Sequence, residues 1–423
     1  MLLQPWIADF AAYNFWIRPL GLYSLSEWLW ERGVAPLIVD CLSPYPAPGR
    51  FKRTPVETPS VLKGFPRRFA RYGISDAQLL LRLERMRPFD AVLITSGMSY
   101  WYPGIKWAIS CIRRIEPRAL IILGGIYATL WTEHAKRHSG ADVVLPGTIR
   151  QIGERLSALL DIPSEPIRTK RPWYRLGLHD GCDYAGIRTT IGCPFKCTYC
   201  ASRILSEGDF IQKTPDRIID EIAALYDMGV RQICFYDDAL LVDFEKRLLP
   251  VLEYVVSKGL KIQFHTPNGL HARFIDKEVS SWLKKAGFST IRLSLETIDP
   301  DRQAKTGGKV LNQEVNEAVA RLLEAGIPRN RIGIYLLIGL PRQDLREVFS
   351  GIRFVRSLGI RPYLAEFSPI PGTVEWKRLE TDNVVSPDMD PLLTNNTVFF
   401  RWFSGYSENQ IEDILRLSKT PTS

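Results

Sequence analysis

The sequence lacks several features that would mark a particular cellular setting. It has no run of 18 or more apolar residues, so a membrane-spanning helix is not expected. The opening residues, MLLQPWIADFAAYNF, carry no basic start and no uninterrupted apolar core, which argues against a secretory signal peptide. Cysteine is scarce and odd in number, at seven residues in 423. We therefore expect a cytoplasmic protein, where clustered thiols bind metal more often than they form disulfides.

The sequence also lacks any recognisable RNA- or DNA-binding motif, although its formal net charge is +9. Basic and aromatic residues occur together in FKRTP (51–55) and GFPRRFARYG (64–73). These stretches suit an ordinary basic surface, and they also suit a phosphorylated, nucleic-acid or anionic-lipid partner. A nucleic-acid partner is not our expectation, but a metal-binding nucleic-acid-binding protein stays open as an alternative function.

The first part of the chain predicts an α/β fold with a Rossmann-like, doubly wound parallel sheet. Short apolar runs alternate with helical periodicity, which is typical of such sheets. Strands are expected at 2–7, 36–41, 89–97, 119–125 and 141–147, and helices at 21–33, 76–86, 102–117, 132–140 and 153–161. Residues 42–65, rich in proline and basic residues, are expected to be a loop. We place this domain at 1–160 and a linker at 161–186.

The alternation restarts after the linker and yields six strand–helix units. Strands are expected at 187–192, 232–238, 262–267, 290–297, 331–339 and 362–370, with helices between them. Such a series predicts a partial (β/α)6 TIM-barrel-like array. We place it at 187–378, followed by a short C-terminal extension at 379–423.

Three of the seven cysteines stand within eight residues, in the stretch TTIGCPFKCTYCAS. Cys193, Cys197 and Cys200 have C-x3-C-x2-C spacing, and no histidine stands among them. A structural zinc site normally has four protein ligands, so three ligands indicate an open coordination position. Thiolates favour zinc, copper(I) or iron–sulfur centres. The motif follows the first strand of the array, where the active sites of β/α barrels lie.

This motif, with Tyr199 before its last cysteine and six strand–helix units around it, resembles the radical SAM superfamily. The resemblance implies that Cys193, Cys197 and Cys200 bind a [4Fe–4S] cluster whose free iron binds S-adenosylmethionine (SAM). An electron from the cluster then cleaves SAM to methionine and a 5′-deoxyadenosyl radical. An external electron donor of the flavodoxin or ferredoxin type is implied as a partner.

The same resemblance implies SAM contacts at the ends of later strands. Asp237 and Asp238 follow the second strand and would hold the amino group of SAM. Ser294 and Glu296 share one face of the fourth strand by alternation. Gly339 belongs to YLLIGLP (335–341), an element that flanks adenine in the family, although Tyr335 stands where the family has glycine. His265, Asn268 and Arg273, near the third strand, are equally compatible with site-facing and structural roles.

Residues 1 to about 160 resemble the cobalamin-binding-type domain that precedes many radical SAM enzymes. Ser96, Tyr100, Trp101, Gly124, Gly125 and Gly147 follow predicted strands and are the candidate cobalamin contacts. The D-x-H-x-x-G signature that supplies a histidine ligand to cobalt is absent, since His134 and His138 lie elsewhere in TEHAKRH. The alternative is a Rossmann-like domain that only shapes the substrate site.

The resemblance leads to a radical SAM enzyme, with cobalamin-dependent methyl transfer to an unactivated carbon as the expected reaction. Ring formation, oxidation or carbon–carbon coupling, with cobalamin structural or absent, is the alternative. A small-molecule or peptide substrate is expected. Cys41, Cys111 and Cys234 are expected to be core residues, whereas Cys182 could approach the cluster or serve as a substrate-side thiol.

Overall fold

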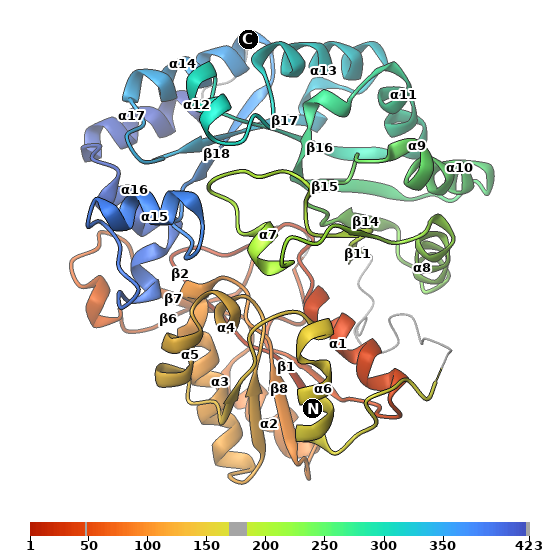
Figure 1. The fold of residues 1–423 in the computed structure, drawn as a ribbon, viewed down its shortest axis with the longest axis vertical. Helices are drawn as coiled ribbons and strands as arrows, with labels where there is room; N and C mark the ends of the chain where they lie inside the picture. Colours follow the sequence, from red (N-terminus) through yellow and green to blue (C-terminus); the bar gives the residue numbers. More distant parts are fainter. Residues whose placement is uncertain (47–48, 169–183, 420–423) are drawn as a thin grey trace. The chain divides into compact units, whose positions relative to one another are not determined.

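The computed structural model describes residues 1–46, 49–168 and 184–419, and the chain divides into two compact units (Figure 1). The first unit joins Met1–Cys182 with Pro387–Thr394, and the second joins Asp183–Ser386 with Asn395–Ser423. The C-terminal 45 residues are thus divided between the two units. The predicted domain boundaries at 160, 186 and 378 stay predictions. Cys182 lies outside the described residues.

The first unit contains the predicted doubly wound parallel sheet, with helices on both faces (Figure 1). The strand order is β10-β9-β8-β1-β4, and every neighbouring pair is parallel. The strands are β1 (Leu2–Gln4), β4 (Ile38–Asp40), β8 (Ala91–Ile94), β9 (Leu120–Leu123) and β10 (Val143–Val144). The helices are α1 (Leu20–Glu31), α2 (Asp76–Arg85), α3 (Tyr102–Ile115), α4 (Ile126–Leu130), α5 (Thr132–His138) and α6 (Ile149–Leu160). Because the strand order reverses between β1 and β8, the switch point where such folds bind ligands lies there.

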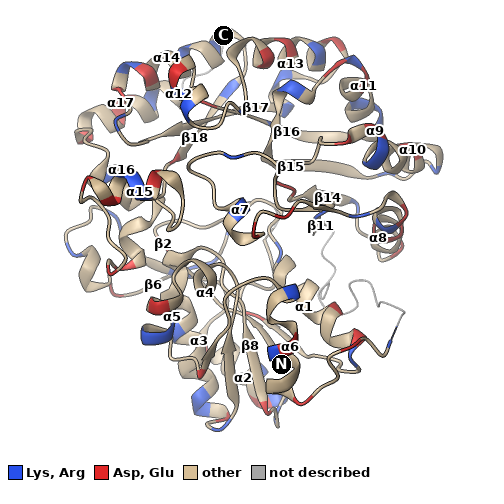
Figure 2. Ribbon diagram, viewed as in Figure 1, with Lys and Arg blue, Asp and Glu red and all other residues tan. Residues whose placement is uncertain are grey.

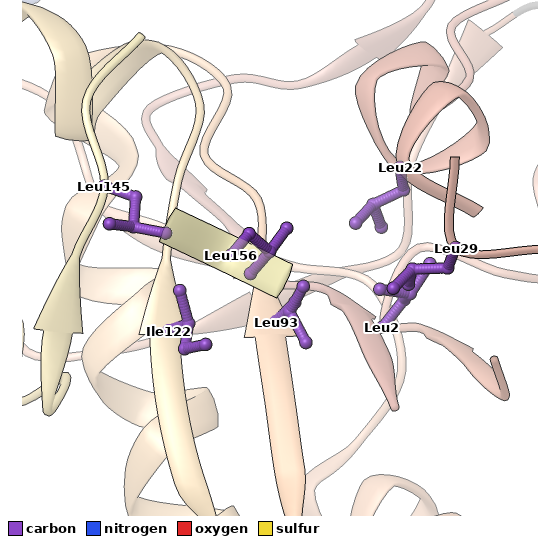
Figure 3. Close-up of a cluster of buried hydrophobic side chains, with 7 residues drawn as sticks. All are labelled: Leu2, Leu22, Leu29, Leu93, Ile122, Leu145 and Leu156. Atoms are coloured by element: carbon purple, nitrogen blue, oxygen red, sulfur yellow. The ribbon is translucent and has the colours of Figure 1, made fainter. Parts of the chain in front are cut away.

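One face of this sheet is covered by α1 and α6. Figure 3 shows Leu22 and Leu29 of α1 and Leu156 of α6 directed at the strands, where Leu2, Leu93 and Ile122 meet them. Burying a leucine side chain contributes about 1.5–3 kcal/mol, so these contacts fix the helices against the sheet. The loops that leave the strands are therefore carried by a rigid support.

Two sequence expectations for the first unit are wrong in detail. The strand expected at 2–7 is two strands, because Pro5 cannot donate to a sheet: β1 ends at Gln4, and β2 (Ile7–Asp9) pairs antiparallel with β7 (Ala70–Tyr72). The expected loop at 42–65 contains β5 (Gly49–Arg50), which pairs with β3 (Tyr13–Asn14), and β6 (Arg53–Pro55), which pairs with β7. It also contains the 3₁₀ helix η1 (Ser60–Leu62). Strands of two or three residues carry too little periodicity to be predicted.

The second unit contains six parallel strands in sequential order, which confirms the predicted partial (β/α)6 array. The strands are β11 (Tyr184–Ile187), β14 (Gln232–Phe235), β15 (Gln263–His271), β16 (Phe288–Glu296), β17 (Ile332–Ile338) and β18 (Arg361–Glu366). The strand expected at 187–192 is displaced: β11 ends at Ile187, and β12 (Thr190–Ile191) pairs antiparallel with β13 (Ile211–Gln212). Charges concentrate on the helices and loops around this sheet (Figure 2).

Helices separate the strands of the second unit. Those between strands are α7 (Ser202–Leu205), α8 (Pro215–Asp227), α9 (Phe244–Arg247), α10 (Leu249–Ser257), α11 (Lys277–Ala286), α12 (Pro300–Lys305), α13 (Asn312–Glu324) and α14 (Leu345–Ser357). Asp276 caps α11 by accepting from Val279 N at 2.8 Å, and Gly287 ends it in the left-handed region.

The chain after β18 forms α15 (Val374–Thr381), the 3₁₀ helix η5 (Pro391–Thr394), α16 (Asn396–Phe403) and α17 (Glu408–Lys419). In the second unit, α16 packs on β18 and α17 packs on α14. Among the described residues, no helix combines the length and the apolar character needed to cross a bilayer.

Candidate functional site

The three cysteines of the C-x3-C-x2-C motif line one cavity in the second unit. The cavity has a volume of about 370 Å³. It lies at the carboxyl ends of the parallel strands, because its lining includes Asp238 after β14, Ser294 near the end of β16 and Ala365 near the end of β18. This is the end of a β/α array at which ligands bind.

The loop that carries the cysteines is held from two sides. On one side Thr198 N donates to Thr306 O at 3.2 Å, and a Cβ on Gly307 would lie 2.9 Å from Lys196 O. Gly307 also has φ +115°, so only glycine fits there without strain. On the other side Thr198 Oγ1 donates to Glu375 Oε1 at 2.6 Å, and Glu375 N donates to Thr198 O at 3.1 Å. The backbone around the thiols is therefore fixed by contacts from α12 and α15.

Burial raises the pKa of all three thiols, that of Cys200 to about 11. The thiols are protonated at neutral pH in the metal-free chain, so metal binding must release protons. Within the described ranges, no group of three His, Cys, Asp or Glu side chains is placed to hold a single metal ion. The three thiols suit a [4Fe–4S] cluster instead, because each thiolate would then bind a separate iron.

The two adjacent aspartates after β14 occupy different environments. Asp238 lines the cavity and accepts a hydrogen bond from Ser202 Oγ at 2.6 Å. Asp237 is buried and is not among the lining residues; its Oδ1 accepts from the backbone N and the side-chain hydroxyl of both Thr189 and Thr190, at 2.5–2.8 Å. Burial raises the pKa of Asp237, and these hydrogen bonds and Arg247 oppose that shift. The structure thus brings Asp238 to the cysteines and uses Asp237 to hold the chain between β11 and β12.

Asp237→Ala is expected to destabilise the protein by about 3 kcal/mol, because it leaves the Thr189 and Thr190 amides without their acceptor and removes the negative charge near the buried Arg247. Asp238→Ala is the matched control and should change the free energy of unfolding by less than about 1 kcal/mol, because Asp238 is exposed. Urea unfolding of both variants measures the difference. Equal destabilisation would contradict the separation of roles.

Ser294 and Glu296 both line the cavity, as the alternation of β16 predicts. Glu296 is unusual because its φ is +68° and the pairing of β16 with β17 shifts register between Ser294 and Glu296. A non-glycine residue in the left-handed region costs about 1–3 kcal/mol and often marks a functional site. A Cβ on Gly269 would lie 2.0 Å from Ser294 Oγ, so this glycine allows β15 to approach Ser294.

Lys309 is a cavity residue that sequence reasoning missed. Its Nζ lies 3.4 Å from Glu296 Oε1, and the two side chains are only 16% and 15% exposed. Burial lowers the pKa of Lys309, but Glu296 and Cys197 outweigh it and the net direction is upward, so the ammonium stays charged. The signal in the sequence is TGGK (306–309), in which Gly307 packs against the cysteine loop and places the lysine beside it.

The remaining candidates of the second unit are divided between the cavity and the core. Tyr335 lines the cavity and donates from its hydroxyl to Pro267 O at 2.8 Å. Gly339 does not line the cavity. Its N donates to Gln343 Oε1, and its φ is +79°. A Cβ at this position would lie 2.7 Å from the ring of Phe400. Asn268 and His271 line the cavity, whereas His265 and Arg273 do not.

Two stacked aromatic side chains, the half-buried Phe195 and the buried His271, line the cavity. The ring of His271 stacks on Phe195 with centroids 4.5 Å apart. Burial lowers the pKa of His271 to about 2, so the imidazole is neutral at neutral pH. Cys41, Cys111 and Cys234 are buried as expected and lie outside this cavity.

The candidate cobalamin residues of the first unit lie in the loops that follow β8, β9 and β10. Ser96 Oγ donates to Gly124 O at 2.8 Å and accepts from Tyr127 N at 2.9 Å, so it ties two of these loops together. Trp101 Nε1 donates to Asp9 Oδ2 at 2.7 Å, and Tyr100 packs edge-on against Trp101. Gly147 N donates to Thr129 Oγ1 at 3.0 Å.

Gly125→Ala is expected to destabilise the first unit by about 2 kcal/mol or more, because Gly125 has φ +86° and a Cβ would lie 2.7 Å from Ser96 O. Gly124→Ala is the matched control, since its Cβ would meet only Leu145 O, at 3.8 Å. Urea unfolding followed by tryptophan fluorescence compares the two. A Gly125→Ala variant as stable as Gly124→Ala would show that this close approach is not required.

His134 lies in α5 and not in the loops that carry the six candidate residues. It is buried, its Nδ1 lies 2.6 Å from Tyr127 Oη, and its ring packs edge-on against Tyr102. Burial lowers its pKa to about 4. The structure therefore gives His134 a packing role, in agreement with the absent D-x-H-x-x-G signature.

Comparison with known proteins agrees with this geometry. The family model described as the radical SAM superfamily matches residues 187–351. An uncharacterized methyltransferase of Pyrococcus horikoshii is 26% identical over 210 residues, 49% of this chain and 44% of its own. A probable GTP 3′,8-cyclase of Methanococcus vannielii is 26% identical over 179 residues, 42% of this chain and 56% of its own. These matches span about half the length of the curated relatives.

A solved structure matches both units. The radical S-adenosylmethionine methyltransferase TsrM of Kitasatospora setae, with tryptophan substrate and a SAM analogue bound, aligns with a TM-score of 0.68 at 14% identity. The alignment covers 90% of this chain and 76% of TsrM. At this identity the likeness shows the fold. With the family match over residues 187–351 and the cysteine cavity, it supports the fold of a radical SAM domain preceded by a Rossmann-like unit.

Proposed function

We propose that the protein is a radical SAM enzyme whose active site is the cysteine cavity of the second unit. The observation that carries the proposal is the convergence of three thiols, Asp238, Glu296 and Lys309 on one cavity at the carboxyl ends of the strands. Cys193, Cys197 and Cys200 would hold a [4Fe–4S] cluster. When bound, the cluster supplies an electron that cleaves SAM into methionine and a 5′-deoxyadenosyl radical.

The charged residues of the cavity match the amino-acid part of SAM. Its carboxylate suits Lys309, the buried cation, and its amino group suits Asp238 or Glu296. Tyr335 and Asn268 supply an aromatic ring and an amide along the same wall. The stacked aromatic pair Phe195–His271 would help to exclude water from one side, which protects a reactive radical from side reactions.

We propose methyl transfer with cobalamin as the reaction class. The support is that TsrM is a methyltransferase, that another of its structures holds cobalamin and a [4Fe–4S] cluster, and that the P. horikoshii relative is named a methyltransferase. In this chain the strand order reverses between β1 and β8, which is where such sheets bind nucleotide-bearing cofactors. Gly124 and Gly125, which follow β9, are half-exposed and leave room for such a cofactor. Cobalamin, when bound, supplies a carrier for a methyl group, and His134 would not be its ligand.

Radical chemistry without methyl transfer is the second candidate, and the match to a GTP 3′,8-cyclase favours it. In that case the first unit would shape the substrate site. A small-molecule or peptide substrate and an external electron donor of the flavodoxin or ferredoxin type complete the proposal.

Anaerobically reconstituted protein, mixed with SAM and dithionite, tests the proposed activity. We expect 5′-deoxyadenosine and methionine in equal amounts, measured by liquid chromatography and mass spectrometry. Addition of candidate acceptors with deuterated SAM then separates methyl transfer from ring formation, since only the first moves the labelled methyl group. Reconstituted protein that contains the cluster but forms no 5′-deoxyadenosine would contradict the proposal.

A further inference from the structure

A second cavity lies within the first unit and is not used by the proposed chemistry. Its volume is about 760 Å³, in the range of small-molecule sites, roughly 300–1,000 Å³. One wall is a stripe of α3, from Tyr102 and Pro103 through Lys106, Trp107 and Ser110 to Arg114. Residues 56–60, Arg71 and Asp76 form the opposite side, and Leu392 of the segment Pro387–Thr394 completes it. None of the six candidate cobalamin residues lines it.

Arg71 is a buried cation with unused hydrogen-bonding capacity. Its side chain is 9% exposed, and its Nε is buried without a hydrogen-bond partner. The guanidinium lies 4.4 Å from the ring centre of Trp6 and 5.9 Å from that of Trp107, so stacking holds its plane. Its ion-pair partner is Asp76, whose side chain is 55% exposed and therefore a screened partner. A planar, rigid guanidinium of this kind suits bidentate binding of a phosphate.

Two further cations of the cavity have no carboxylate partner among the described residues. Lys106 and Arg114 are exposed, and neither is within ion-pair distance of an acidic side chain. They are eight residues apart on one stripe of α3, which separates them by about 12 Å. Trp107 lies between them and offers a half-buried indole to a planar ring. Glu57 and Asp76 are the acidic lining residues, so the lining retains a positive balance.

We propose that this cavity binds a small phosphate-bearing molecule with a planar ring. Arg71 receives the phosphate, Trp107 packs on the ring, and Lys106 and Arg114 offset the negative charge. The segment Pro387–Thr394 forms part of the site: Leu392 lines the cavity, and Tyr102 Oη donates to Asp390 Oδ2 at 3.0 Å beside it. A bound ligand would thus stabilise the attachment of this segment to the first unit. The proposal is independent of the cluster.

Isothermal titration of the full-length, reconstituted protein with phenyl phosphate tests this site. We expect a dissociation constant of about 1 mM or tighter, with phenol and inorganic phosphate each binding at least about tenfold more weakly, because each lacks one half of the recognition. The Lys106→Gln/Arg114→Gln variant should weaken phenyl phosphate binding about tenfold. The Lys63→Gln/Arg118→Gln variant removes two exposed charges outside the cavity and should bind as the parent does.

Absence of binding up to about 10 mM phenyl phosphate would overturn the proposal. So would unchanged affinity in the Lys106→Gln/Arg114→Gln variant, since binding would then lie elsewhere. All four positions are exposed, so loss of folding is not expected, and circular dichroism verifies it. Formation of 5′-deoxyadenosine by the same preparations is measured in parallel, which separates failure of this site from failure of the proposed function.

Discussion

Cys197→Ala is expected to abolish 5′-deoxyadenosine formation and to remove most of the bound iron. Cys197 lines the cavity, and its loop is held in place by Thr306, Gly307 and Glu375. With only Cys193 and Cys200 left, the chain would hold the cluster weakly, and the electron needed to cleave SAM would not be supplied. We expect the rate of SAM cleavage to fall at least about 10³-fold, a loss of about 4 kcal/mol in transition-state stabilisation.

Cys111→Ala is the matched control, because this cysteine lies in α3, is buried and does not line the cysteine cavity. The variant should keep the iron content and the SAM cleavage of the parent protein. Iron analysis and product quantification on the same samples compare the two variants. If Cys197→Ala kept full turnover, the assignment of the cluster ligands would be wrong.

Lys309→Met is expected to weaken SAM binding by about ten- to a hundredfold while leaving the iron content unchanged. Methionine keeps the approximate length of the side chain but removes the charge that faces Glu296 at 3.4 Å. The SAM carboxylate then loses its cationic partner, and Glu296 stays partly buried without one. Removing one member of a fully buried ion pair typically costs about 3–5 kcal/mol. The cost is smaller here because both side chains are partly exposed and solvent screens their charges.

Equilibrium binding of SAM to the reconstituted variant measures this effect. Lys305→Met is the control, because Lys305 is exposed and does not line the cysteine cavity. Lys309→Arg should retain more affinity than Lys309→Met, because the charge remains although the geometry changes. Unchanged SAM affinity in Lys309→Met would show that the carboxylate is bound elsewhere.

The cysteine motif and the strand–helix alternation could be predicted because both are local patterns. Cys193, Cys197 and Cys200 lie within eight residues, and six apolar strands alternate with helices. The alternation of β16 also placed Ser294 and Glu296 on one face. Such features depend on spacing along the chain, which the sequence contains directly.

The rest of the site depends on contacts between distant segments. Glu375 reaches Thr198 across 177 positions, and Tyr102 reaches Asp390 across 288. Asp237 and Asp238 look alike in sequence, and only the two threonines after β11 make one of them structural. The pairing of Lys309 with Glu296 could not be predicted, because a register shift in β16 sets the position of Glu296. None of these contacts leaves a periodic signal in the sequence.

Glu296 is a strained residue held within a rigid strand of the cavity. Glu296 has left-handed backbone geometry next to the close approach of Gly269 to Ser294. The cost of this conformation is offset by the surrounding strands, which are buried and paired on both sides. A carboxylate held in this way is already oriented before a ligand arrives, which lowers the entropy lost on binding.

The metal content of anaerobically reconstituted protein tests the central claim most directly. The protein is incubated with iron, sulfide and hydroxocobalamin, desalted, and analysed for iron, sulfide, zinc and cobalt per chain. We expect about four irons and four sulfides, as a [4Fe–4S] cluster requires, and about one cobalt if the first unit binds cobalamin. Four irons without cobalt would support the second candidate reaction. Zinc bound in place of iron, with no cluster absorbance, would contradict the account.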